Sequence, residues 1–286
     1  NTPLTITMCE FNSQVLPPPM PATWTWGYIV GTTCPTTTQD TYLGPVIVNK
    51  RATTATPSPT SITWVNNLGT TATTQVLAYK YSTDQTLHWA DPLAMPGSEN
   101  MCNHMAMYPM FGDPCSLNYG EAMAAPIPAV THLHGGEVPP ELDGGPDAWF
   151  TSDGMYKGHG YYSFGAPGNS AIYNYPNTQE AGPLWFHDHT LGATRLNVYA
   201  GLAGGYYIYD PALNLPANLQ PLTEVVPIIL QDRMFDINGQ LFFQADSAGG
   251  ILWATNPEHP YWSPEFVGDT IVVNGKAWPY LSVQAK

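Results

Sequence analysis

The chain has 286 residues and a formal net charge of −14, from 22 acidic and 8 basic residues. This length corresponds to roughly two domains, and the negative charge argues against nucleic acid or an anionic membrane surface as a partner. Only 10% of the residues are charged, whereas 29 are Pro, 26 are Gly and 17 are Tyr, a composition that favours short strands joined by ordered loops over helices.

The chain begins at Asn1 and carries four cysteines, none of them in a CxxC pair. Both features are typical of a processed, exported protein, in which an even number of cysteines favours disulfides. Of the three possible pairings we expect the local bridge Cys102–Cys115, which leaves Cys9–Cys34. The sequence lacks an Asn-x-Ser/Thr glycosylation signal, which favours a bacterial source. We therefore expect a secreted, cell-envelope or periplasmic protein, and no apolar run reaches the length of a membrane-spanning helix.

Strand signals recur at short spacing along the chain. Alternating or β-rich runs predict strands at 61–65, 74–81, 171–175, 183–189, 205–209 and 224–231. Asn238-Gly239 is a hairpin signal, and Asn274-Gly275 repeats it within 269–278. Helical periodicity is faint, with a turn or two expected at 194–200. The pattern predicts an all-β fold of the sandwich or barrel type.

A domain boundary is expected within 210–221, which contains three prolines and has no periodicity. We expect a first β-domain at 1–210. The remainder, 211–286, is too short for a second sandwich of about 100 residues, and so we interpret it as a linker followed by the first part of a second domain.

Two segments carry paired histidines: Thr131-His132-Leu133-His134-Gly135 and Trp185-Phe186-His187-Asp188-His189. Residues i and i+2 of a strand point to the same face, so each pair presents two imidazoles side by side. One such pair is often merely solvated, but two adjacent strands of this kind bring four imidazoles together. Neutral imidazoles suit copper or zinc, and the sequence therefore predicts a metal site.

The histidines alone leave open a zinc enzyme and a non-catalytic copper-binding protein. A zinc hydrolase of the barrel type would need βα repeats, which are missing, and a carbonic-anhydrase-like site needs a third histidine on a neighbouring strand. The other alternative is a non-catalytic copper-binding protein that uses the two pairs as a half-site. None of the remaining histidines has a matching strand context: they are His88, His104, His159 and His259.

The two histidine segments resemble the first two copper motifs of multicopper oxidases, nearest to spore-coat laccases, bilirubin oxidases and phenoxazinone synthases. The resemblance is strong at 130–210 and 223–283 and loose before residue 130. Its other parts are the segments that follow the two motifs, the start of the family's second domain, and an early strand: Asp143–Phe150, Thr194–Leu202, Asp269–Leu281 and Trp26-Gly27-Tyr28.

The resemblance implies cupredoxin-like Greek-key β-domains, three in the whole enzyme. It also implies one-electron oxidation of phenolic, aromatic amine, tetrapyrrole or metal-ion donors, coupled to reduction of O2 to water at a trinuclear copper cluster. By motif position, His132 resembles the type 2 copper ligand. The type 3 ligands are then His134, His187 and His189. Asp143 resembles an acid that supplies protons near the cluster, although it would also suit the turn before Gly144-Gly145. Asp188 points to the opposite face and is interpreted as structural.

The resemblance is incomplete in a specific way. The family's His-x-x-His-x-His and His-Cys-His motifs, which supply four more cluster ligands and the type 1 copper site, are absent from this chain. We therefore expect half of the cluster here and the rest on a C-terminal fragment or second chain.

A methionine-rich loop invites a second copper hypothesis. Thioethers favour Cu(I), but methionine also fills irregular space beneath a disulfide-closed loop, and we favour that interpretation. The residues concerned are Met101, Cys102, His104, Met105, Met107 and Met110.

Overall fold

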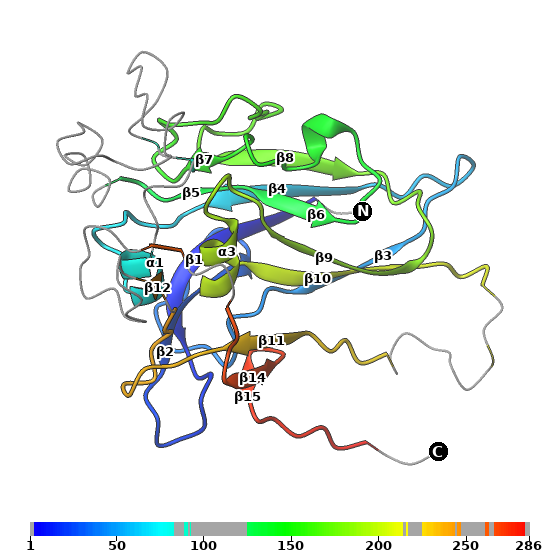
Figure 1. Ribbon diagram of the computed structural model, residues 1–286. Helices are drawn as coiled ribbons and strands as arrows, with labels where there is room; N and C mark the ends of the chain where they lie inside the picture. Colours follow the sequence, from blue (N-terminus) through cyan, green and yellow to red (C-terminus); the bar gives the residue numbers. More distant parts are fainter. Residues whose placement is uncertain are drawn as a thin grey trace.

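A computed structural model of the chain (Figure 1) describes residues 3–82, 89–90, 92, 125–213, 216, 225–243, 245–246, 261–262 and 266–283. The strands are β1 (Leu4–Ser13), β2 (Thr23–Val30), β3 (Val46–Lys50), β4 (Thr60–Asn66), β5 (Pro128–Ala129), β6 (Thr131–His134), β7 (Phe150–Thr151), β8 (Ser170–Tyr175), β9 (Gly182–Asp188), β10 (Ala203–Tyr209), β11 (Leu230–Arg233), β12 (Ala245–Asp246), β13 (Tyr261–Trp262), β14 (Thr270–Val273) and β15 (Lys276–Ala277). The helices are α1 (Leu77–Ser82) and α3 (Thr194–Ala200), and η4 (Pro140–Leu142) is a single 3-10 turn.

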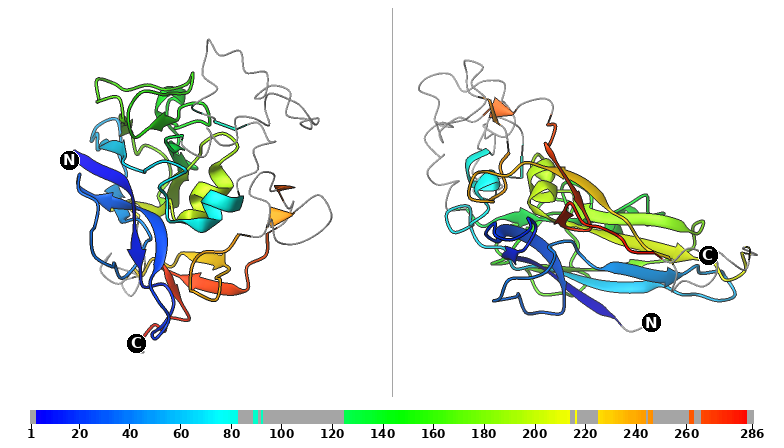
Figure 2. Two further views of the ribbon diagram at one scale, coloured as in Figure 1. Left: turned by 90° about the vertical axis from the view of Figure 1, so that its left-hand side faces the viewer. Right: turned by 90° about the horizontal axis from the view of Figure 1, so that it is seen from below.

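Two four-stranded sheets pack face to face, with strand orders β2-β1-β4-β8 and β3-β10-β9-β6. Within them β1 pairs with β4 and β10 pairs with β3 in parallel, while the other neighbours are antiparallel. Strands distant in sequence are therefore neighbours in space, as Figures 1 and 2 show. This is the predicted cupredoxin-like β-sandwich.

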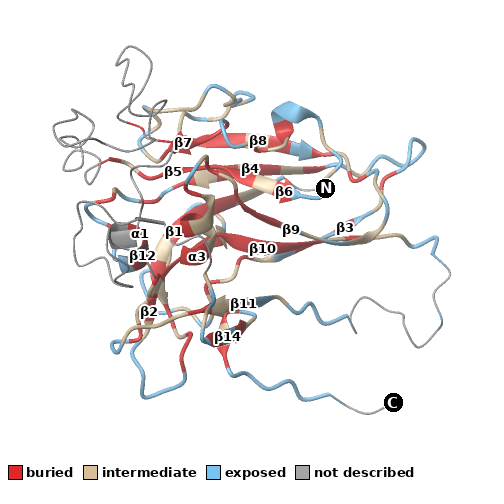
Figure 3. Ribbon diagram, viewed as in Figure 1, coloured by how far each residue is buried: buried red, intermediate tan, exposed pale blue. Residues whose placement is uncertain are grey.

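The core between the sheets is aromatic and fully buried (Figure 3). The ring centroid of Tyr28 lies 5.5 Å from that of Trp64 in the same sheet and 5.1 Å from that of Phe186 in the second sheet. Gly204 makes room for Phe186, because a Cβ there would lie 2.2 Å from the end of that ring. These contacts fix which face of β9 points inward, and so which face carries its histidine.

One predicted strand, 74–81, is wrong: the chain turns there and forms helix α1. The carboxylate of Glu10 accepts hydrogen bonds from the Thr74 hydroxyl and the Gln75 N–H. Such side-chain contacts compete with a strand ladder. Val76 and Tyr79, three residues apart, are buried on one face of the turn and helix, and the Tyr79 ring lies 4.7 Å from Trp26. Tertiary packing therefore overrides the β-rich composition.

The strand and the hairpins that were predicted near the C-terminal end can also be compared with the structure. The strand predicted at 224–231 is confirmed only from Leu230, where β11 begins. The hairpin at Asn274-Gly275 is confirmed, since both residues have positive φ (50° and 81°) between β14 and β15. This is the backbone that a two-residue type I′ turn requires. At Asn238-Gly239 the chain reverses, with a bridge between Phe235 and Leu241.

Strands β11, β14 and β15 form a small sheet that lies against the sandwich (Figure 1). Tyr42 donates its hydroxyl proton to Gln231, 2.7 Å away, and the Ala277 N–H donates to the Val15 carbonyl at 2.9 Å. Val272 is buried in the same cluster as Tyr42. A division of the chain at residue 210 remains a prediction.

The Cys9–Cys34 disulfide is confirmed, with Cα atoms 5.5 Å apart. Cys102, Cys115 and the methionine-rich loop 101–110 lie outside the described residues. In the described part of the chain, no helix has the length and apolar character needed to span a membrane.

Candidate metal centre

The two histidine pairs lie side by side at the edge of one sheet. Strand β6 pairs with β9 so that His132 is directly opposite His187, and His134 is opposite Trp185. Thr131 and Leu133 alternate with the histidines and are buried in the core. The period of two along each strand therefore does what the sequence predicted: it turns the imidazoles to one face.

The four rings converge on one small volume. Nitrogen atoms of His132, His134 and His187 all lie within 4.8 Å of one another. His189 is the first residue after β9. The centroid of its ring lies 4.8 Å from that of His132 and 5.7 Å from that of His187. The structure thus brings together all four histidines that the sequence singled out.

The ring nitrogens are oriented as in a metal centre. Nδ1 of His132 lies 2.6 Å from the Asp143 carbonyl, and Nδ1 of His187 lies 2.5 Å from the Asp188 carbonyl. A carbonyl only accepts, so each Nδ1 carries the proton and each Nε2 keeps a free lone pair. Metal-bound histidines characteristically donate their second N–H in this way.

Two nitrogens point at each other across the centre of the cluster. His134 Nδ1 and His187 Nε2 are 3.1 Å apart. Two nitrogens each about 2.0 Å from one ion, in tetrahedral or square-planar geometry, lie about 3 Å apart. Nδ1 of His189 is buried and has no hydrogen-bond partner among the described residues. The donor set therefore fits a bound transition-metal ion.

Burial favours the neutral form of two of the imidazoles, those of His187 and His189. Desolvation, together with the neighbouring histidines, lowers the pKa of His187 to about 4. The pKa of His189 is lowered as well, chiefly by burial. A neutral imidazole is the form that binds a metal ion, so the two residues are ready for coordination near neutral pH.

Trp185 covers one side of the centre and was missed by the sequence analysis as a site residue. Its ring is stacked on His187 with centroids 4.1 Å apart, and it lies 5.1 Å from His134. It occupies the same face of β9 as His187, two residues away, which is the signal that could have found it.

The loop after β6 supplies the contact to His132. Asp143 touches this histidine mainly through its main-chain carbonyl, while its carboxylate lies 3.4 Å from Nδ1 and is 39% exposed. Gly144 has φ +66°, and a Cβ there would lie 1.9 Å from the Thr131 carbonyl oxygen. The turn interpretation of Asp143 and its placement beside the cluster are therefore both compatible with the structure.

Asp188 points away from the imidazoles into the core and has no exposed surface. Burial is the largest influence on its carboxyl and raises the pKa to about 7, opposed by hydrogen bonds from Thr190 and Val130.

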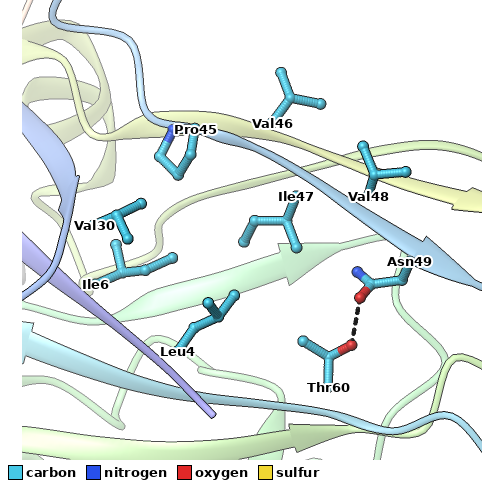
Figure 4. A pocket seen from close by; sticks show the side chains of 9 residues that line it. All are labelled: Leu4, Ile6, Val30, Pro45, Val46, Ile47, Val48, Asn49 and Thr60. Atoms are coloured by element: carbon cyan, nitrogen blue, oxygen red, sulfur yellow. Dashed lines mark hydrogen bonds between the residues drawn. The ribbon is translucent and has the colours of Figure 1, made fainter. Parts of the chain in front are cut away.

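Other candidates lie elsewhere. His159 is an exposed loop residue, whereas His88, His104 and His259 lie outside the described residues. An apolar groove of about 340 Å³ (Figure 4) opens at the opposite edge of the sandwich, beside β3, and ends at the Asn49–Thr60 hydrogen bond. Since β3 and β6 are the two edge strands of one sheet, this groove is remote from the histidines.

Comparison with known proteins agrees with this geometry. Residues 124–213 match the family model "Multicopper oxidase". Over 159 residues the chain is 43% identical to multicopper oxidase LPR1 homolog 1 of Oryza sativa subsp. japonica, covering 55% of this chain and 25% of that protein. A laccase of Bacillus subtilis (strain 168) is 40% identical over 163 residues, which is 56% of this chain and 29% of the laccase.

Residues 124–213 of this chain are therefore a multicopper oxidase domain. Solved structures share its fold: the McoA multicopper oxidase of Aquifex aeolicus has a TM-score of 0.52 at 20% identity, over 99% of this chain and 41% of that one. A laccase of Pediococcus acidilactici has the same score and identity, over 97% and 38%. This chain thus spans well under half the length of these relatives. It covers only part of such an enzyme, and the matched family implies copper as a cofactor, with which the histidine cluster is consistent.

Proposed function

We propose that this chain supplies half of the ligands of a trinuclear copper cluster in a laccase-like oxidase. The observation that carries the proposal is the convergence of four imidazoles, two of which have their outer nitrogens fixed on main-chain carbonyls. His132 would hold the type 2 copper. His134, His187 and His189 would hold type 3 copper.

Bound copper would supply one-electron redox chemistry linking oxidation of a small donor to reduction of O2 to water. The donor would be a phenol, aromatic amine, tetrapyrrole or metal ion. The chain's own residues bind and orient: the Asp143 and Asp188 carbonyls fix the rings of His132 and His187, and the Trp185 ring packs beside those of His187 and His134. The Asp143 carboxylate, partly exposed beside His132, would pass protons from solvent towards the centre.

The remaining ligands would come from a C-terminal part that carries the His-Cys-His and His-x-x-His-x-His motifs. The small C-terminal sheet supports this idea, because among the described residues the sandwich covers only one of its faces. On the other face Leu230 and Ile271 are 67% and 56% exposed. Figure 3 shows the same exposure along the segments that flank this sheet. An apolar sheet face of this kind is normally covered in a finished domain.

Export to an oxidising compartment also belongs to this proposal. The Cys9–Cys34 disulfide forms and persists in the periplasm or outside the cell. Of the alternatives, a non-catalytic copper-binding protein shares the cluster and differs only in lacking the oxidase partner. The barrel-type zinc hydrolase is disfavoured by the sandwich fold.

The test uses the complete polypeptide that contains this chain, loaded with copper. We expect the double variant His132→Ala/His187→Ala to lose copper and oxygen consumption with a phenolic donor. His159→Ala, an exposed histidine elsewhere, is the control and should behave as wild type. Unchanged copper content in the double variant would overturn the proposed site, whereas copper binding without oxygen consumption in wild type would favour the non-catalytic alternative.

A further inference from the structure

Asp188 separates two of the proposed ligands, yet its side chain lies on the opposite side of the strand from them. We propose that Asp188 is a positioning residue of the copper centre, which holds the two histidine-bearing segments together and sets the ring of His187. This inference rests on the proposed function and assigns a role to a residue that binds no metal itself.

The carboxylate bridges the two segments. Its Oδ2 accepts hydrogen bonds from the Val130 N–H at 3.0 Å and from the Thr190 hydroxyl at 2.8 Å. Its Oδ1 accepts the Thr190 N–H at 2.9 Å. Val130 precedes His132 by two residues, and Thr190 directly follows His189. One side chain therefore connects the start of the first histidine pair to the end of the second.

The main chain of Asp188 and its neighbour adds further links. The Asp188 carbonyl contacts Nδ1 of His187 at 2.5 Å, and its N–H donates to the Leu202 carbonyl on the way into β10. The next N–H, that of His189, donates to the Val130 carbonyl at 3.0 Å. Displacement of Asp188 would thus be transmitted to both flanking ligands.

The hydrogen bonds of the sheet alone do not hold the two histidine-bearing segments together at this end. The pairing of β6 with β9 ends at Thr131 opposite Asp188, so the Val130 and Thr190 N–H groups lie beyond the last ladder pair. The carboxylate serves as their acceptor where the ladder has stopped. An apolar residue would be easier to bury at a core position, but it would leave these two N–H donors without an acceptor. The need for an acceptor explains a carboxyl group in this place.

The decisive variant is Asp188→Asn in the complete polypeptide. Asparagine has the same shape, but one of its two terminal atoms becomes a donor facing Thr190 or Val130. Residues that orient metal ligands typically change metal affinity by about 10–100-fold when mutated. We expect a loss of this size in Cu(II) affinity, measured by competition with a chelator at low temperature. We also expect altered hyperfine splitting in the Cu(II) EPR spectrum, because the histidine geometry changes.

Asn177→Gly is the matched control. Asn177 is buried and also makes three side-chain hydrogen bonds, to Ser58, Thr60 and Tyr206, and glycine tolerates its φ of +58°. This variant should lower the unfolding temperature of the copper-free protein but leave Cu(II) affinity and EPR as in wild type.

Two results separate the possible failures. If Asp188→Asn lowers the unfolding temperature as Asn177→Gly does, but keeps wild-type copper affinity and EPR, Asp188 is only structural and the inference is overturned. If His132→Ala/His187→Ala keeps wild-type copper affinity, the proposed function fails and the inference fails with it.

Discussion

His132 is oriented by the main chain of the loop that follows β6, and this has a testable consequence at the single residue. Gly144→Ala would place a Cβ 1.9 Å from the Thr131 carbonyl oxygen in a backbone with φ +66°, so the loop must move and the Asp143 carbonyl must leave His132. We expect a loss of about 3 kcal/mol in stability together with loss of copper, measured by chemical unfolding and metal analysis.

Asp143→Asn keeps the carbonyl and should retain copper while slowing oxygen reduction.

Gly165→Ala is the control for Gly144→Ala. Gly165 also has a positive φ, of +87°, but a Cβ there meets nothing within 4 Å. This variant should lose only the backbone term of about 1–2 kcal/mol and keep its copper. Equal stability loss in both glycine variants, with copper retained in both, would contradict a role for Gly144 in placing the loop.

Residue by residue, the four histidines could be predicted and their supports could not. A period of two puts His132 and His134 on one face whatever the rest of the chain does. The Asp143 contact is largely made by a main-chain carbonyl, which every residue carries, so residue type gives no signal for it. Asp188 was correctly assigned to the opposite face. Its partners could not be predicted, because the N–H groups of Val130 and Thr190 lack a partner in the sheet only where the pairing of the two strands ends.

At the level of elements, Tyr199 on α3 joins the helix to the C-terminal segment. Its hydroxyl accepts the Met234 N–H at 2.9 Å and donates to the Phe242 carbonyl, and its ring lies under the Arg233 guanidinium. Tyr199→Phe should cost about 1–3 kcal/mol, since the Met234 N–H loses its partner in a buried setting. We expect faster hydrogen exchange at Met234 and neighbouring amides of β11.

The control is Tyr161→Phe, which removes the hydrogen bond from a tyrosine hydroxyl to the Ser170 carbonyl in the sandwich. It should lower stability without selectively exposing β11. If both variants change exchange at Met234 equally, Tyr199 is not a specific link between the helix and the segment.

Element prediction succeeded where local chemistry decides and failed where packing does. The Asn274-Gly275 hairpin needs positive φ at two residues, which these residue types favour, and helix α3 lies at the predicted 194–200. Helix α1 was predicted as a strand, because the decisive contacts of Thr74 and Gln75 are made to Glu10, far away in sequence. No local pattern contains that partner.

For the whole molecule, the last prediction concerns the uncovered face of the C-terminal sheet. Leu230 and Ile271 share this face, because β11 and β14 pair Leu230 with Val273 and Asp232 with Ile271. If this sheet is the beginning of a second domain, the isolated 286-residue chain should self-associate through it. We expect sedimentation velocity to show concentration-dependent oligomers for wild type, and mostly monomer for Leu230→Lys/Ile271→Lys.

Met155→Lys, which replaces a 75% exposed side chain on a loop of the sandwich, is the control and should associate like wild type. Co-expression with the proposed C-terminal part should suppress association of the wild-type chain. A wild-type chain that stays monomeric at high concentration would show that this face needs no covering partner.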